Sequence, residues 1–216
     1  MEIYPGTQPQ NSPFEQSNRP KDVVLRLISH LENSGRNITA DNWFSSVPLV
    51  RELLERGITY VGTLRKNKRE LPPELLSKKR IAHSSIFAFR DDMTVVSYAP
   101  KRNRCVVLVS SMHFDAAIDP DTLDKSKPDI ITFYNSTKSG VDVVDEKCGT
   151  YSTCQRWPLV LFYHLLDIAG INGQVIFLSN CQEEKVMERR KFLREVGLEM
   201  IKPHVAKRAT VSSHRL

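Results

Sequence analysis

Residues 36–64 read RNITADNWFSSVPLVRELLERGITYVGTL, a stretch in which a strand pattern, a helix pattern and a second strand pattern follow one another. Residues 36–40 form a short strand that leads into Asp41. Residues 47–56 have the apolar spacing of a helix, with a proline in its first turn and a glycine directly after it. Residues 58–64 are rich in β-branched and aromatic side chains, as strands are. This strand–helix–strand order predicts a right-handed crossover and a sheet with parallel character.

The segments on either side extend this unit. Apolar spacing before it predicts an amphipathic helix over 21–34. The segment after it has a different pattern, which predicts an antiparallel meander of three short strands over residues 85–89, 93–98 and 105–112. One more strand is expected over residues 130–134. Helices are expected over 140–148, 157–180 and 183–200, the second buried on most faces, with a loose tail after Pro203.

Composition indicates a folded intracellular protein. The chain has 216 residues, 40% of them hydrophobic, which is enough for a core, and 26% charged. No signal peptide is expected at the start, and no apolar run approaches the roughly 18 residues of a membrane span. The four cysteines form no CxxC pair, which fits a reducing compartment and indicates neither a disulfide framework nor a zinc module.

Basic residues are unevenly distributed. The formal net charge is +6, and residues 65–80 hold seven basic and two acidic side chains. Residues 185–216 hold nine basic and three acidic side chains. Each run alone is equally well explained as a solvated face or loop. Two separated basic segments on one chain favour an extended anionic ligand.

Three aspartates stand out as candidate metal ligands. Asp41 follows a predicted strand, where ligands of α/β sheets bind, although a turn or helix-cap role explains it as well. Asp142 and Asp145 lie three residues apart, on one face of a helix, where ordinary helix-start acids also occur. Carboxylate pairs bind Mg²⁺ or Mn²⁺, and two such ions catalyse phosphoryl transfer on nucleic acids. His164 lies on the long apolar helix, where we expect a core histidine with no catalytic partner.

Four segments carry a resemblance to a known family: NITADNWFSSVPL (37–49), TYVGTLRKNKRELP (59–72), YNSTKSGVDVVDEKCGTYST (134–153) and RWPLVLFYHLLDIAGIN (156–172). In order and spacing they resemble the transposase domain of piggyBac-type elements and piggyBac-derived cellular proteins. The resemblance implies an α/β fold with a partial ribonuclease H-like core, a β-rich insertion at about 85–135 and C-terminal helices. The domains expected are residues 1–180 and a basic helical tail, 181–216.

The resemblance also implies an activity, the metal-dependent DNA strand cleavage and transfer of a DDE/D transposase. Asp41 is then the second catalytic aspartate, Asp142 the third and Asp145 the acid that follows it, and all three are expected to hold Mg²⁺ or Mn²⁺. The basic residues expected to bind double-stranded DNA are Arg65, Lys66, Lys68 and Arg69. The protein is expected to be nuclear, and a homodimer is a possible assembly. No association with a membrane is expected.

Departures from the family pattern predict that this chain is inactive by itself, with impaired metal binding. The family's first catalytic aspartate lies upstream of the segment that the first residues resemble. The segment Cys154-Gln155-Arg156 is shorter than its family counterpart. The family's terminal cysteine-rich zinc module and N-terminal DNA-binding region have no counterpart. Two alternatives remain: a domesticated, non-catalytic DNA-binding module, or a nuclease that recruits Glu2 or Asp22 as a substitute acid.

Overall fold

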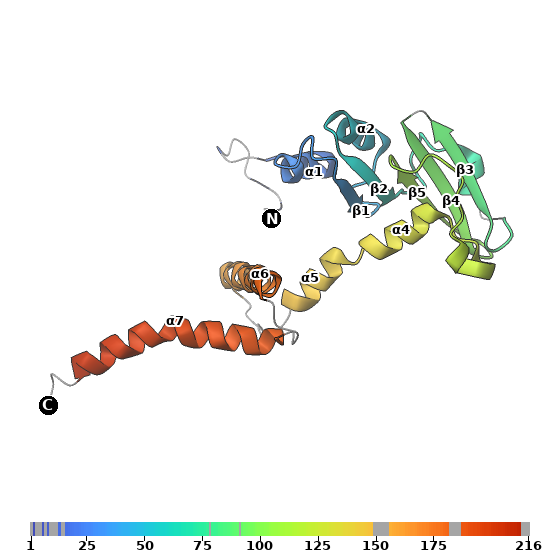
Figure 1. The fold of residues 1–216 in the computed structure, drawn as a ribbon. Coiled ribbons are helices and arrows are strands. Elements are labelled where there is room, and N and C mark those ends of the chain that lie inside the picture. The colour runs from blue at the N-terminus through green and yellow to red at the C-terminus, as the bar shows by residue number, and fades with distance from the viewer. Residues whose placement is uncertain are drawn as a thin grey trace. The chain divides into compact units, whose positions relative to one another are not determined.

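The computed structural model describes residues 2, 6, 8, 13, 16–77, 79–90, 92–148, 156–181 and 187–212. The chain divides into two compact units, Met1–Ser139 and Gly140–Leu216. The first is a mixed α/β unit and the second is helical (Figure 1).

A five-stranded mixed sheet organises the first unit, in the order β1-β2-β5-β4-β3. The strands are β1 (Asn37–Ala40), β2 (Thr59–Thr63), β3 (Ser85–Arg90), β4 (Met93–Lys101) and β5 (Arg104–Ser110). β1 pairs with β2 in parallel, as the sequence predicts, and every other pairing is antiparallel. The predicted meander therefore exists, and it continues the same sheet because β5 pairs with β2.

Helices cover both faces of this sheet (Figure 1). On one face, α1 (Pro20–Ile28), α2 (Val47–Glu55) and α3 (Pro73–Leu76) pack against inward side chains of β2, β4 and β5. On the other, α4 (Asp129–Thr137) packs on side chains such as Val61 and Leu108. A 3₁₀ helix, η1 (Pro120–Lys125), precedes α4. Adjacent residues Tyr60 and Val61 serve opposite faces, as the two-residue period of a strand requires.

The crossover between β1 and β2 follows from local chemistry. The Ser46 side chain caps α2 by accepting a hydrogen bond from the Leu49 N–H, and Pro48 lies in the first turn. Leu49 and Leu53 are fully buried, one turn apart. Gly57 follows the helix at φ +67°, a conformation that glycine adopts without strain.

Two predicted elements were wrong. Residues 130–134 belong to α4, not to a strand, because Pro128 and Asp129 start a helix and Ile130 and Tyr134 then share its packed face. Residues 204–212, beyond Pro203, are also helical, since α7 (Arg189–Ser212) includes them. The helix propensity of the residues after the proline offsets the loss of the one backbone hydrogen bond that the proline cannot donate.

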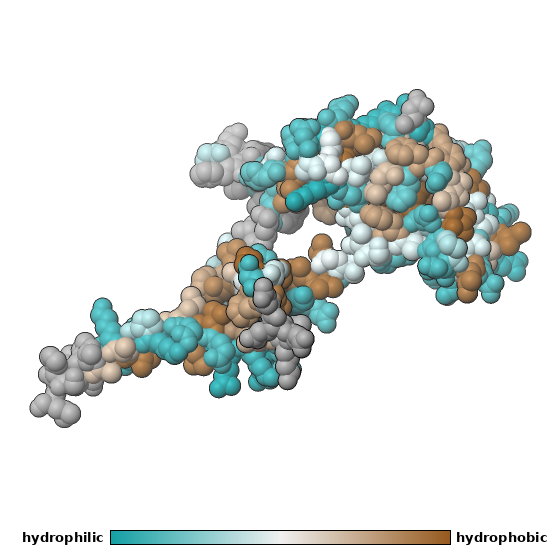
Figure 2. Space-filling model, viewed as in Figure 1, coloured by the Kyte–Doolittle hydropathy of each residue, from teal (hydrophilic) through white to brown (hydrophobic). Residues whose placement is uncertain are grey.

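The helical unit holds α5 (Gly140–Cys148), α6 (Trp157–Asn180) and α7. The prediction that α6 is buried on most faces was wrong, because α6 and its neighbours bury Ile171 while most other apolar side chains of α6 remain exposed (Figure 2). By length and composition alone, α6 could cross a membrane, contrary to the sequence-based expectation. One such helix is weak evidence, since helices of soluble proteins meet the same criterion.

Candidate functional site

Asp41 directly follows β1 and organises the turn that leads to α2. Its Oδ1 accepts a hydrogen bond from the Trp43 N–H at 2.9 Å. Its backbone carbonyl accepts hydrogen bonds from the Ser45 N–H at 3.2 Å and the Ser45 hydroxyl at 2.7 Å. The side chain is exposed at the carboxyl end of a parallel strand, where α/β sheets bind ligands. The turn role and a ligand role are therefore compatible, because one carboxylate oxygen serves the turn.

A buried hydroxyl pair fixes this turn to the sheet. The Ser45 Oγ and the Tyr60 hydroxyl lie 2.6 Å apart, and both residues are buried. Burial raises the pKa of Tyr60 to about 12, so the phenol stays protonated over the ordinary pH range. Gly62 lies in the same contact: a Cβ there would meet the Ala40 carbonyl oxygen and Ser45 Oγ, each at 2.7 Å. β1 and β2 thus approach closely just below Asp41.

Arg65 is held beside the Asp41 turn. Its Nε donates a hydrogen bond to Asn42 Oδ1 at 3.1 Å, and its guanidinium lies over the Trp43 ring, 5.0 Å from the centroid. Arg65 and Trp43 are both exposed, so the guanidinium faces solvent next to the candidate metal ligand. The sequence identified Arg65 and Asp41 separately; the adjacent tryptophan was the signal that links them.

The other three basic residues lie in the same loop, between two anchors. Leu64 and Leu71 are buried at its ends. Within it, the Lys68 N–H donates to the Arg65 carbonyl, and the Leu71 N–H donates to the Lys68 carbonyl. Lys66 and Lys68 are half-buried, and Arg69 is exposed. We call residues 65–70 the basic loop; its contact with DNA stays a prediction.

Asp142 and Asp145 lie on α5, both exposed and three residues apart, as the sequence predicts. They belong to the helical unit and Asp41 to the sheet unit, so their convergence stays a prediction. All three are exposed carboxylates, and hard oxygen donors of this kind suit Mg²⁺ or Mn²⁺. The donor set therefore fits the expected cofactor.

The proposed substitute acids are engaged elsewhere. Glu2 pairs with Arg26 at 2.5 Å, and this hydrogen bond is the main reason that the pKa of Glu2 is lowered. Asp22 Oδ2 accepts a hydrogen bond from the Ser17 hydroxyl. Both contacts are in the region of α1, and they give each carboxylate a structural role.

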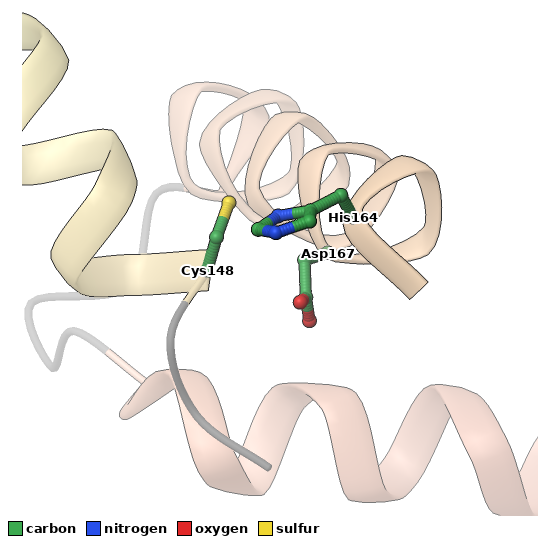
Figure 3. Close-up of side chains that lie close together, drawn as sticks. All are labelled: Cys148, His164 and Asp167. Atoms are coloured by element: carbon green, nitrogen blue, oxygen red, sulfur yellow. The ribbon is translucent and has the colours of Figure 1, made fainter. Parts of the chain in front are cut away.

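The sequence missed a cluster in the helical unit. Cys148 ends α5, and His164 and Asp167 lie three residues apart on α6 (Figure 3). Their ligand atoms all lie within 4.8 Å of one another. Burial raises the pKa of the Cys148 thiol, and the Asp167 carboxylate raises it further. His164 is exposed, so its prediction as a core histidine was wrong. The His-x-x-Asp spacing on a helix was the available signal. Cys154 and Gln155, in the shortened segment, lie outside the described residues.

Comparisons with known proteins agree with this architecture. A family model described as Transposase IS4 matches residues 1–174. Among solved structures, the chain is similar to a piggyBac transposase in its synaptic complex with hairpin DNA, at 38% identity and a TM-score of 0.81. The similarity covers 95% of this chain and 43% of that chain, so the present chain spans less than half of its solved relative. The chain therefore belongs to the piggyBac-type transposase family.

Proposed function

We propose that this chain forms part of a DDE/D transposase centre that binds double-stranded DNA, with Asp41, Asp142 and Asp145 as its metal ligands. The observation that carries the proposal is the contact of Arg65 with Asn42 and Trp43, directly after Asp41. A guanidinium binds phosphate through paired hydrogen bonds. Its position brings a phosphate-binding group next to a carboxylate that can hold a divalent cation. That juxtaposition suits phosphoryl transfer on DNA.

The basic loop has the features of a phosphate-binding segment. Its four cationic side chains, Arg65, Lys66, Lys68 and Arg69, are carried by a short connection with buried ends. Contacts of such side chains with phosphates fix the position of a duplex without reading its sequence. In the solved complex, the relative binds hairpin DNA, which supports the same class of partner for this chain.

Chain connectivity supports the convergence of the three aspartates. Thr39 lies two residues before Asp41, and its hydroxyl donates to the Thr137 hydroxyl at 2.8 Å. An extended chain spans at most about 3.6 Å per residue, so the Cα atoms of Thr137 and Asp142 lie within about 18 Å. The covalent chain therefore returns to the end of β1 shortly before α5 begins.

In the proposed phosphoryl transfer, the metal ion and the residues of the chain have different roles. A bound Mg²⁺ or Mn²⁺ supplies charge stabilisation at the reacting phosphate and activation of the attacking oxygen. Asp41, Asp142 and Asp145 provide the oxygen ligands. Arg65 and the rest of the basic loop bind and orient the phosphate backbone. Trp43 and Asn42 position the guanidinium.

We further propose that the chain alone binds DNA without transferring strands. A catalytic unit that lacks one member loses roughly 10³–10⁶ in rate where such units have been dissected. The similarity covers 43% of the solved relative, and the activity of that longer protein is not proposed for this chain alone. We also propose a nuclear location, because the proposed partner is DNA. Exposed apolar side chains of α6, such as Phe162 and Ile176, support a homodimer, which light scattering can test.

Two assays of the full chain test this function. Titration of a labelled duplex, followed by fluorescence anisotropy, should show binding that weakens as salt increases, because phosphate contacts release counterions. Plasmid nicking by the wild-type chain with Mn²⁺ should be undetectable, and any nicking that does occur should be lost in Asp41→Asn. Absence of DNA binding at low salt would contradict the proposal. Binding without nicking supports the DNA-binding module, and nicking that survives Asp41→Asn would exclude Asp41 as a ligand.

A further inference from the structure

Cys148, His164 and Asp167 form a compact cluster whose chemistry the transposase centre does not use. A thiol, an imidazole and a carboxylate come together from the end of α5 and one face of α6 (Figure 3). Cys148 is buried, Asp167 is half-buried and His164 is exposed, so the cluster has a buried side at the thiol and a side open to solvent at the imidazole. All three residues belong to the helical unit, so its geometry is internal to that unit.

The donor set and the spacing suit a borderline transition metal. Zn²⁺ binds Cys sulfur at about 2.3 Å and His nitrogen or Asp oxygen at about 2.0–2.2 Å, in tetrahedral geometry. Ligand atoms of such an ion are therefore about 3.3–3.8 Å apart. The three ligand atoms already lie within 4.8 Å of one another. Side-chain rotations that move these atoms about 1 Å closer together therefore complete the site. Three protein ligands leave the fourth position of the tetrahedron to water.

We propose that Cys148, His164 and Asp167 bind one Zn²⁺ ion that joins the end of α5 to α6. α5 carries Asp142 and Asp145, and Cys148 is three residues beyond Asp145. An ion at this point fixes the axis and rotation of the helix that presents the candidate catalytic aspartates. This positioning role builds on the proposed function, whereas the metal site itself does not depend on it.

The zinc site and the Asp142–Asp145 pair differ in metal preference. Sulfur and imidazole ligands favour Zn²⁺ and Co²⁺, while carboxylates alone favour Mg²⁺ and Mn²⁺. Excess Mg²⁺ should therefore leave the Cys148 site loaded. Asp142→Asn should also leave it loaded, because Asp142 supplies no ligand to the zinc ion.

Co²⁺ titration of the reduced, metal-free full chain provides the test, because cobalt bonded to a thiolate gives a charge-transfer band in the near ultraviolet. The wild type should develop this band to one equivalent, and Zn²⁺ should abolish it while Mg²⁺ should not. Cys148→Ser should lose the band. His164→Asn and Asp167→Asn should weaken cobalt binding by at least about tenfold, the lower bound for loss of an outer-shell partner.

Cys181→Ser and His204→Asn serve as matched controls, because both residues lie outside the cluster, and both should keep the wild-type titration. His164 is exposed, so His164→Asn should keep the wild-type circular dichroism and remain informative even if Cys148→Ser fails to fold. A wild-type chain without the stoichiometric band would overturn the zinc site. So would a band that is unchanged in His164→Asn. Neither result depends on DNA binding or cleavage, so the two proposals fail separately.

Discussion

The hydroxyl of Thr39 donates a hydrogen bond to the hydroxyl of Thr137 at 2.8 Å, although the two residues are 98 positions apart in sequence. Thr137 in turn donates to the Phe133 carbonyl within α4. The contact joins β1, just before Asp41, to the end of the helix that precedes α5. It shows how a chain with a long β-rich excursion returns to the edge of the sheet where the first candidate ligand lies.

Replacement of Arg65, Lys66, Lys68 and Arg69 by alanine should weaken duplex binding equally for every sequence tested, because phosphate contacts carry no base information. The slope of log K against log[salt] should flatten by up to about 0.9 per lost contact. Anisotropy titrations at several salt concentrations measure both effects. Alanine replacement of Arg189, Arg190, Lys191 and Arg194 on α7 removes the same charge and measures separately what the second basic segment contributes. An unchanged slope in the loop variant would show that the basic loop touches no phosphate.

Trp43→Ala should weaken DNA binding less than Arg65→Ala, because it removes the surface on which the guanidinium rests and leaves the charge in place. An exposed cation–π contact contributes about 0.5–1 kcal/mol, which corresponds to roughly a two- to fivefold change. Trp43→Phe should recover part of the affinity, since it keeps an aromatic face. Equal loss in the phenylalanine and alanine variants would argue against this role of the ring.

Gly62→Ala should destabilise the sheet unit by about 1–3 kcal/mol, because its Cβ would meet the Ala40 carbonyl oxygen and Ser45 Oγ at 2.7 Å. Urea denaturation followed by tryptophan fluorescence measures the loss, with Trp43 reporting from this unit. Gly197→Ala, where a Cβ meets nothing within 4 Å, should be neutral or stabilising to α7. A Gly62→Ala chain as stable as the wild type would show that the strands can separate at little cost.

Tyr60 should make stability fall at high pH. Its pKa is raised from 10 when exposed to about 12 in the folded chain, so the folded state holds the phenol proton more tightly. The contribution of this pKa shift to the free energy of unfolding is fully present below pH 10. About 2 kcal/mol of it is lost as the pH rises toward 12. Tyr60→Phe lacks the titration, so the stability advantage of the wild type should shrink over that interval. A constant difference between the two proteins from pH 9 to 12 would contradict the buried phenol.

The sequence predicted the sheet unit well because local signals agreed there. Pro48 and Gly57 bounded α2 correctly, and the three short strands of the meander lie close to their predicted positions. It failed for residues 130–134, where β-branched residues pack on a helix face, and for Pro203. The prediction that α6 is buried on most faces was also wrong, because burial depends on which elements surround a helix and not on its composition alone.

Prediction of the site was limited by contacts between distant residues. Asp41 and Arg65 were each predicted from the sequence, but Arg65 reaches the Asp41 turn only through its contacts with the side chains of Asn42 and Trp43. Nothing in the linear spacing of Cys148, His164 and Asp167 showed that α5 would end against α6. Three-dimensional packing alone brought that cluster together.

Paramagnetic broadening by Mn²⁺ measures whether Asp41, Asp142 and Asp145 hold the same divalent cations. Substoichiometric Mn²⁺, added to the isotope-labelled chain, broadens the amide signals of residues close to the ion. We predict broadening of residues 41–45 and of residues 141–146 at the same Mn²⁺ concentration. Asp142→Asn should reduce both together, with Asp124→Asn, an exposed acid before α4, as the control. Broadening of only one of the two segments, or loss at one alone in Asp142→Asn, would contradict a shared metal site.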